Sequence, residues 1–142
     1  MAFDPALLAL LAQRNLGVLA TIKRDGRPQL SNVNYHFDGE LMRIRVSVTD
    51  DRAKVKNLRR DPRASLLVSS ADGWSYVVAE ADVTLSGVAT EPHDDAVEEL
   101  IEVYREAAGK DHPDWDDYRR AMVEDRRLVA RLAITRVYGM AR

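Results

Sequence analysis

The chain has 142 residues, of which 46% are hydrophobic and 31% are charged, so we expect one folded domain spanning 1–142. It contains no cysteine, which excludes disulfide bonds, thiolate nucleophiles and cysteine-ligated metal centres. The formal net charge of -2 at pH 7 argues against general affinity for nucleic acid. Met1 to Leu11 has no basic leader and too short an apolar stretch to span a bilayer, so we expect a cytoplasmic protein without a membrane segment.

The first half of the chain predicts a helix followed by an antiparallel meander. Asp4 is a helix N-cap residue, Pro5 suits the first helical position, and the leucines that follow have helical spacing. The pair Asp25-Gly26 is favoured in hairpin turns, so the strands on either side of it should pair antiparallel. The expected elements are a helix over 4–15 and strands over 17–22, 28–37 and 41–47.

The second half predicts a basic helix, two strands, two acidic helices and a closing strand. Val55 and Leu58 would share one face of a short helix that stops at Asp61-Pro62. The later elements are strands over 65–70 and 74–86, the second long enough to bulge, helices ending near Gly109 and beginning near Trp115, and a strand over 132–138. Six strands in short hairpins with peripheral helices predict a mainly β (α+β) antiparallel barrel or sandwich rather than a Rossmann sheet.

The charges are unevenly distributed along the chain. Residues 52–63 contain six basic side chains and one acidic one, whereas residues 91–118 contain eleven acidic and two basic ones. The acidic helices could form a partner-binding surface, but we interpret them as a solvated surface, which is the usual explanation of such charge. For the basic segment two interpretations stay open. It is either a solvated helix face, or an anion site in which Arg52 and Lys54 join the N–H groups of a helix N-terminus to hold a phosphate.

Several standard catalytic sites are absent from the sequence. The glycines form neither a dinucleotide fingerprint nor a P-loop, and no serine stands in a nucleophile elbow. His36, His93 and His112 are far apart, so a metal site would need distant segments, and we expect none. If the protein is an enzyme, a bound cofactor should carry the reaction, and the sequence identifies no catalytic side chain.

The second expected strand has an unusual polar face, formed by Ser31, Asn32, Asn34 and His36. Asparagine is depleted in strands, so this face is either a hydrogen-bonding surface for a flat polar ligand or a wetted sheet face. Trp74 and Tyr76 are two residues apart and should share one face of their strand. Their rings could stack on a ligand, or they could belong to the core or to an interface.

Four segments carry a resemblance to a known family: Gly17 to Ile22, Asp25 to Val33, Arg52 to Ser65, and Gly73-Trp74. In this order they resemble the pyridoxamine-phosphate-oxidase-like split β-barrels, and more narrowly the actinobacterial flavin/deazaflavin oxidoreductases that use coenzyme F420. The resemblance covers essentially the whole chain, and the ordered series is more specific than any one segment.

The resemblance implies a homodimer of split β-barrels with two cofactor clefts at the subunit interface, and F420 as the cofactor. By position, Arg52 and Lys54 would hold the cofactor phosphate, with Ser47 nearby. Lys56, Asn57 and Arg60 would contact the acidic oligoglutamate tail of F420. The residues that would line the ring are Ala20, Thr21, Pro28, Gln29, Leu30, Ser31 and Asn32, with Trp74 as a further cofactor contact.

Similar enzymes transfer a hydride from C5 of the reduced deazaflavin, so the resemblance implies an F420H2-dependent reductase of an electron-poor small molecule. The proton would come from solvent or from a side chain such as His36 or Tyr138. The chain lacks the Arg-Leu-x-Pro ending of true pyridoxamine-phosphate oxidases, so oxidation of pyridoxamine phosphate is not expected. Two alternatives stay open: an FMN-binding oxidoreductase of the same fold, and a non-catalytic barrel that binds a flavin or a tetrapyrrole.

Overall fold

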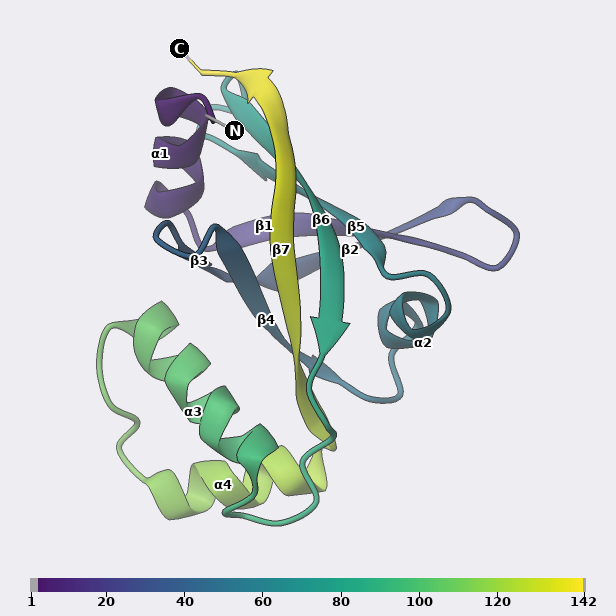
Figure 1. The fold of residues 1–142 in the computed structure, drawn as a ribbon. Helices are drawn as coiled ribbons and strands as arrows, with labels where there is room; N and C mark the ends of the chain where they lie inside the picture. The colour runs from purple at the N-terminus through teal and green to yellow at the C-terminus, as the bar shows by residue number, and fades with distance from the viewer. Residues whose placement is uncertain (1–2, 142) are drawn as a thin grey trace.

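A computed structural model describes residues 3–141, which form seven strands and four helices (Figure 1). The helices are α1 (Pro5–Gln13), α2 (Ala53–Arg60), α3 (Asp95–Ala108) and α4 (Trp115–Glu124). The strands are β1 (Leu16–Ile22), β2 (Pro28–Asn34), β3 (His36–Asp38), β4 (Arg43–Thr49), β5 (Arg63–Ser69), β6 (Tyr76–Leu85) and β7 (Arg127–Met140). All strand pairs are antiparallel, which agrees with the expected fold class.

The strands form one sheet in the order β2-β1-β5-β6-β7-β4-β3. Its two edge strands, β2 and β3, are separated in the chain by Tyr35 alone. Because consecutive Cα atoms are only about 3.8 Å apart, the sheet must curl until its two edges come close, which makes it a barrel. Figure 1 shows the curl: β1 and β2 run across the direction of β6 and β7.

Tyr35 divides what the sequence predicted as a single strand over 28–37. Its side chain is buried, its hydroxyl donates to the Leu11 carbonyl at 2.7 Å, and its N–H donates to the Asn15 carbonyl at 2.9 Å. The backbone therefore leaves the β1 ladder at this residue and enters the β4 ladder at the next one. The prediction of a single strand over 28–37 is therefore wrong. The sequence pattern does not reveal the break because the alternation of buried side chains continues through it, with Val33 and Tyr35 both buried.

The barrel interior and α1 form one hydrophobic core. α1 begins as predicted: Asp4 accepts a hydrogen bond from the Ala6 N–H at 2.9 Å, and Pro5 occupies the first turn. α1 packs against strands of the sheet beside the C-terminal end of β7 (Figure 1). The buried core side chains include Leu7, Leu10 and Leu11 of α1 and Leu19, Ile44, Leu66, Val77 and Leu132 of the strands.

α3 and α4 form a separate helical layer at the other end of the barrel (Figure 1). Asp94 caps α3 by accepting from the Val97 N–H at 2.9 Å, and Gly109 ends it in the left-handed region with φ 71°. The two helices bury a second cluster that includes Leu100 and Met122, so both expected helices are confirmed. Within residues 3–141 no helix has the length and apolar character needed to cross a membrane.

Two acidic side chains of α3, the largely buried Glu99 and the exposed Glu106, form ion pairs with the sheet. Glu99 accepts hydrogen bonds from Arg131 Nη2 at 2.6 Å and Nε at 2.9 Å, and it lies 3.4 Å from Arg45 Nη1. Glu106 accepts from Arg45 Nη2 at 2.7 Å and lies 3.2 Å from His36 Nδ1. Arg45 and Arg131 are cross-strand partners in β4 and β7. An ion network therefore fixes α3 on the sheet, and Glu99 is an exception to the solvated acidic surface that the sequence predicts.

The last strand is longer than the sequence predicted. β7 begins at Arg127, whereas the apolar pattern indicated only 132–138. It pairs with β4 over its first half and with β6 over most of its length, and a bulge between Glu80 and Ala81 confirms the expected irregularity of β6. Charged residues at the start of β7 interrupt the apolar pattern, although the backbone pairing continues through them. The pattern therefore underestimates the length of the strand.

Candidate functional site

The barrel is split along one seam. β2 pairs only with β1, and β3 pairs with β4 only at residues 43–45. Residues 46–49 of β4 therefore have no strand paired to them on the side that faces β2. A cleft of about 960 Å³ opens at this seam. Its walls come from β2, the end of β4, the start of α2, one side of α3 and α4, and the start of β7.

The turn after β4 brings the N-terminus of α2 to the cleft. Asp50 in this turn is held by Arg59 at 2.6 Å and by Arg126 at 3.2 Å, and these hydrogen bonds lower its pKa. Arg52 occupies the N-cap without a side-chain hydrogen bond to the helix, and its Nε donates to Thr49 Oγ1 at 3.2 Å. The first N–H groups of α2 and the Arg52 guanidinium therefore lie at the cleft wall, where both favour an anion.

Lys54 reaches from α2 across the seam to β2. Its Nζ donates to Ser31 Oγ at 3.2 Å. Burial lowers the pKa of Lys54, and the charges of Arg52 and Arg127 lower it further. A bound anion would offset the repulsion from Arg52 and Arg127 and so favour the charged ammonium.

Arg127 is a third cation of the cleft, and the sequence analysis missed it. It is the first residue of β7, it is the ladder partner of Thr49 at the end of β4, and its Nη1 lies 3.4 Å from Ser47 Oγ. The only sequence signal is the pair Arg126-Arg127 before an apolar strand. That signal does not reveal the register that places Arg127 opposite the end of β4.

The helical wall of the cleft is apolar and aromatic. Tyr104 and Tyr118 both line it, with ring centroids 5.2 Å apart in an edge arrangement, and Trp115 packs against both rings. The Tyr118 hydroxyl donates to the Leu100 carbonyl at 3.0 Å, and burial raises the pKa of Tyr118 to about 12. The cleft thus combines a cationic end with an apolar wall, which suits a ring that carries an anionic group.

Asn57 joins α2 to the β1–β2 hairpin. Its Nδ2 donates to Thr21 Oγ1 at 3.0 Å and to Gln29 Oε1 at 2.8 Å, and its Oδ1 accepts from Arg60 Nη2 at 3.0 Å. Asn57 and Thr21 are buried. Through these hydrogen bonds, Asn57, Thr21 and Arg60 help to position α2 against the hairpin. That they also contact a cofactor stays a prediction.

We expect Asn57→Ala to lower the free energy of unfolding by about 1–3 kcal/mol, because it leaves the buried Thr21 hydroxyl and the Gln29 amide without their partner. Urea denaturation measures the loss. Lys56→Ala is the control, since Lys56 is the exposed neighbour on the same helix and its replacement should stay within about 0.5 kcal/mol. A loss for Asn57→Ala no greater than that of the control would contradict the stabilising role of these hydrogen bonds.

Alternation along β1 and β2 divides the predicted ring-lining residues between two faces of the sheet. Gln29 and Ser31 face α2 and the cleft, as their hydrogen bonds show. Ala20 and Leu30 are cross-strand partners on the outer face, and Leu30 is 64% exposed. Asn32 shares that face but borders the cleft at the strand edge. A single chain therefore does not bring the whole predicted set into one cleft.

Five other predicted residues lie away from the cleft wall. Trp74 is 70% exposed in the turn before β6, so the prediction that it shares a strand face with Tyr76 is wrong. Lys56 is exposed on α2, and Pro28 is exposed at the start of β2. His36 belongs to the ion network beneath α3, and Tyr138 is 43% exposed on β7. Roles in cofactor binding or proton donation stay predictions for these residues.

The curled antiparallel sheet, open along one seam and basic at that seam, defines a split β-barrel. The family model for pyridoxamine 5'-phosphate oxidase matches residues 3–141. The chain belongs to this family of flavin-binding oxidoreductases, which confirms the family resemblance seen in the sequence.

Solved structures share the fold at low sequence identity. A structure described as an F420 reductase has a TM-score of 0.67 and 20% identity, over 95% of this chain and 98% of that chain. A conserved hypothetical protein from Mycobacterium tuberculosis has a TM-score of 0.75 and 23% identity, over 99% and 86%. A haem storage protein from Vibrio cholerae has a TM-score of 0.68 and 16% identity, over 98% and 95%. At these identities the similarity establishes the fold.

Proposed function

We propose that the protein is an oxidoreductase that binds F420 in the cleft and transfers a hydride from the reduced cofactor to an electron-poor small molecule. The observation that carries the proposal is the gathering of Arg52, Lys54 and Arg127 at one end of the cleft. These cations fit a phosphate, and the volume of about 960 Å³ lies within the range of cofactor pockets. The family supplies the class of reaction.

Different residues of the cleft would bind the phosphate, contact the ring and exclude water. Arg52 and Lys54 hold the phosphate by charge-assisted hydrogen bonds, since both line the cleft. Ser31 accepts from Lys54 through Oγ, so its own hydroxyl hydrogen is left to donate to a carbonyl at the ring edge. The wall of Tyr104 and Tyr118 excludes water from the ring. The reduced cofactor, when bound, supplies the hydride, and no protein side chain needs to act as a nucleophile.

F420 and FMN differ in the charge that lies beyond the phosphate. The acidic tail of F420 would suit the exposed basic side of α2, where Lys56 lies. The similarity to a structure described as an F420 reductase also supports F420. FMN is the second candidate, because the match to the pyridoxamine 5'-phosphate oxidase family covers residues 3–141 and the cationic end of the cleft would hold its phosphate equally well.

Titrations of the purified protein with F420, with FMN and with haem, followed by fluorescence or absorbance, test the proposal. We expect saturable binding of F420, weaker binding of FMN, and reduction of electron-poor acceptors by F420H2. Tight binding of FMN alone would assign the protein to the flavin-dependent branch. Binding of a flavin or of haem without catalysed hydride transfer would indicate a non-catalytic barrel, and binding of none of these ligands would contradict the proposal.

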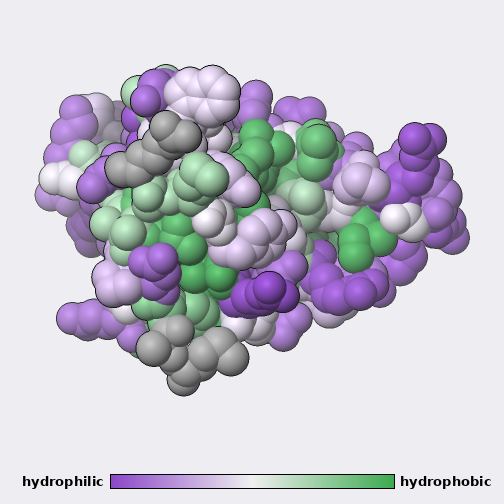
Figure 2. All heavy atoms as spheres, turned by 90° about the horizontal axis from the view of Figure 1, so that it is seen from above, coloured by the Kyte–Doolittle hydropathy of each residue, from purple (hydrophilic) through white to green (hydrophobic). Residues whose placement is uncertain are grey.

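We also propose that two copies of the chain pair through the outer face of the sheet. An apolar row crosses four strands of this face in register: Val18, Leu67, Val78 and Tyr138. Leu67 is 38% exposed and Tyr138 is 43% exposed, and Figure 2 shows hydrophobic residues gathered across one face of the molecule. Contiguous exposed apolar surface is typical of protein interfaces. Such pairing would also cover the predicted ring-lining residues Ala20 and Leu30, which share the outer face.

Leu67→Asp is expected to convert the dimer into a monomer, because it places a charge in the middle of the apolar row. Sedimentation velocity measures the change. Leu41→Asp is the matched control, since Leu41 is 61% exposed in the turn before β4, outside the row, and should leave the dimer intact. A wild-type protein that is monomeric at micromolar concentration would contradict the pairing.

A further inference from the structure

The proposed reduction needs a proton as well as a hydride, and few side chains of the cleft can supply one. Within residues 3–141, no aspartate, glutamate or histidine lines the cleft, and neither does Tyr138. Arginine does not release its proton in proteins, and Lys54 belongs to the cationic end of the cleft. Serine and threonine hydroxyls are much weaker acids than phenols. The remaining candidates are the three tyrosines that line the cleft: Tyr35, Tyr104 and Tyr118.

Two of these tyrosines donate their hydroxyl protons to the backbone. The Tyr35 hydroxyl donates to the Leu11 carbonyl at 2.7 Å, and burial raises the pKa of Tyr35. The Tyr118 hydroxyl donates to the Leu100 carbonyl at 3.0 Å, and burial raises the pKa of Tyr118 to about 12. Backbone carbonyls therefore hold both protons, and burial opposes their release.

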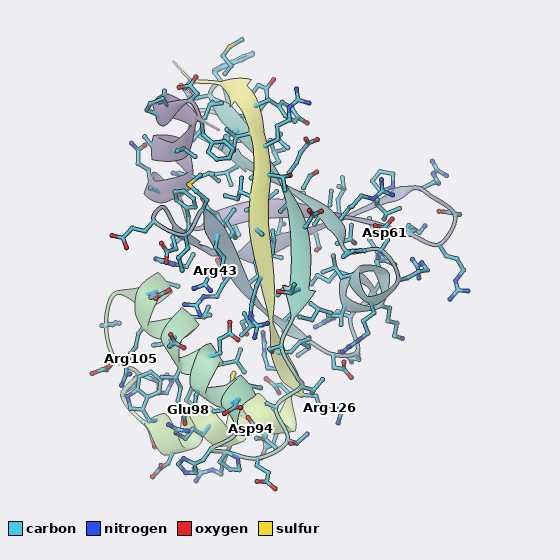
Figure 3. All side chains as sticks on the ribbon, viewed as in Figure 1. Arg43, Asp61, Asp94, Glu98, Arg105 and Arg126 are labelled. Atoms are coloured by element: carbon cyan, nitrogen blue, oxygen red, sulfur yellow. The ribbon has the colours of Figure 1, made fainter. Side chains whose placement is uncertain are left out.

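Tyr104 has a fixed ring and a free hydroxyl. Among the described residues this hydroxyl has no hydrogen-bond partner, and it is not one of the buried polar atoms, so a ligand can reach it. The ring centroid lies 5.2 Å from those of His112 and Tyr118 and 5.7 Å from that of Trp115. Arg105 lies over Trp115 in turn, with its Cζ 4.9 Å from the ring centroid (Figure 3). Packing therefore fixes the phenol ring and leaves its hydroxyl able to donate.

The helical wall around Tyr104 is uncharged. The other residues by which α3 and α4 line the cleft are Val103, Ala107, Ala108, Tyr118 and Met122. Ala107 and Ala108 are short and lie one turn further along α3, so they leave room beside the tyrosine. An aromatic and aliphatic wall with one hydroxyl donor suits a flat, uncharged molecule that carries a carbonyl oxygen.

We infer that Tyr104 donates a hydrogen bond to a carbonyl oxygen of the acceptor and then gives the acceptor the proton that completes its reduction. The hydroxyl meets the two requirements of a general acid, a transferable proton and access to the ligand. The inference rests on the proposed function for the source of the hydride, and on the helical wall alone for the hydrogen bond.

An acceptor whose carbon–carbon double bond is conjugated to the carbonyl shows how the step balances. The hydride adds to the carbon β to the carbonyl, and the electron pair of the double bond moves toward the carbonyl oxygen, which gives an enolate. The O–H bond of Tyr104 breaks, and its proton joins the enolate oxygen that the hydroxyl already contacts. The enol then rearranges to the saturated ketone, and water returns a proton to the tyrosinate. Two electrons pass from the reduced cofactor to the acceptor.

Binding of a matched pair of ligands tests the hydrogen bond. Benzylideneacetone is a flat, uncharged enone, and its analogue has a methylene group in place of the carbonyl oxygen. Equilibrium dialysis measures both on the protein alone and on the protein saturated with oxidised F420, which has no hydride to give. We expect Tyr104→Phe to weaken binding of the enone about 3- to 10-fold, the loss of one neutral hydrogen bond, and to leave binding of the analogue unchanged. Tyr76→Phe is the control, because Tyr76 lies on β6 and does not line the cleft.

Single-turnover kinetics test the proton transfer. With F420H2 bound, Tyr104→Phe should reduce benzylideneacetone about 100- to 10,000-fold more slowly than the wild type, which is the range of general acid catalysis, with the affinity for F420H2 unchanged. Added imidazolium should raise the rate of this variant in proportion to its concentration, because a soluble acid replaces the missing donor. Tyr76→Phe should react as the wild type does.

An unchanged affinity of Tyr104→Phe for the enone would overturn the inference, and so would an equal loss for both ligands, which would assign Tyr104 a purely structural role. An unchanged rate would overturn the proton transfer. If neither F420 nor FMN binds, the proposed function fails and the proton transfer falls with it. A selective loss of the enone on the protein alone would still establish the hydrogen bond from Tyr104.

Discussion

Replacement of Glu99 by alanine is expected to lower the free energy of unfolding by roughly 3 kcal/mol. The Glu99 side chain is only 14% exposed, and it lies 2.6 Å from Arg131 Nη2 and 3.4 Å from Arg45 Nη1. The two arginines are cross-strand partners, so loss of the carboxylate leaves two like charges opposite each other beneath α3. Urea denaturation at pH 7 measures the loss.

Glu98 provides the matched control for this substitution. It is the preceding residue of α3, its side chain is 52% exposed, and it pairs with Arg119 at 2.6 Å (Figure 3). An exposed ion pair contributes about 0.2–1 kcal/mol, so Glu98→Ala should destabilise the protein much less than Glu99→Ala. Equal losses in the two variants would show that the network beneath α3 contributes no more than a surface pair.

The same carboxylate predicts a dependence of stability on pH. Burial alone would raise the pKa of Glu99, but the hydrogen bonds and charges of Arg131 and Arg45 outweigh it and hold the pKa below its usual 4.5. A carboxyl whose pKa is lowered on folding stabilises the native state above its unfolded pKa, and this stabilisation is lost as the pH falls through the folded pKa. The difference in stability between wild type and Glu99→Gln should therefore be full at pH 7 and shrink as the pH falls below about 4.5. A difference that stays constant down to pH 3 would contradict this account.

The helices were predictable because their signals act within a few residues. The Asp4-Pro5 start of α1, the stop of α2 at Asp61 and the left-handed Gly109 after α3 all depend on local backbone chemistry. The break at Tyr35 was not predictable in this way. It depends on a hydrogen bond to Leu11, which is 24 residues away, and no local pattern reports that partner.

Charge patterns in the sequence did not show which charged side chains are buried or line the cleft, because strand register decides this. Glu99 looks like any other acid of an exposed helix until the register of β4 and β7 brings two arginines beneath it. Arg127 likewise cannot be told from Arg126 by composition, because the reversal after α4 and the pairing with Thr49 decide which of them lines the cleft. The family resemblance supplied candidates on α2 and β2, whereas the cation from β7 emerged only from the pairing of distant strands.

Lys54→Met is expected to weaken binding of F420 or FMN roughly 10- to 100-fold, which corresponds to the loss of one charge-assisted hydrogen bond. Methionine keeps most of the aliphatic stem that packs beside the seam and removes the charge that reaches Ser31. Lys23→Met is the control, because Lys23 is exposed in the β1–β2 turn and does not line the cleft. Unchanged affinity in Lys54→Met would place the phosphate elsewhere.

The affinity of the wild type should also fall on the alkaline side, at a pH below the ordinary 10.5 of lysine. Burial and the neighbouring Arg52 and Arg127 lower the pKa of Lys54 in the free protein, and a bound anion favours the protonated ammonium. The contribution of Lys54 to binding is therefore complete below its lowered pKa and is lost as the pH rises through it. Titrations of wild type and Lys54→Met across this range should converge, because the variant has no ammonium to lose. Parallel curves would mean that another group titrates in the cleft and that Lys54 does not hold the anion.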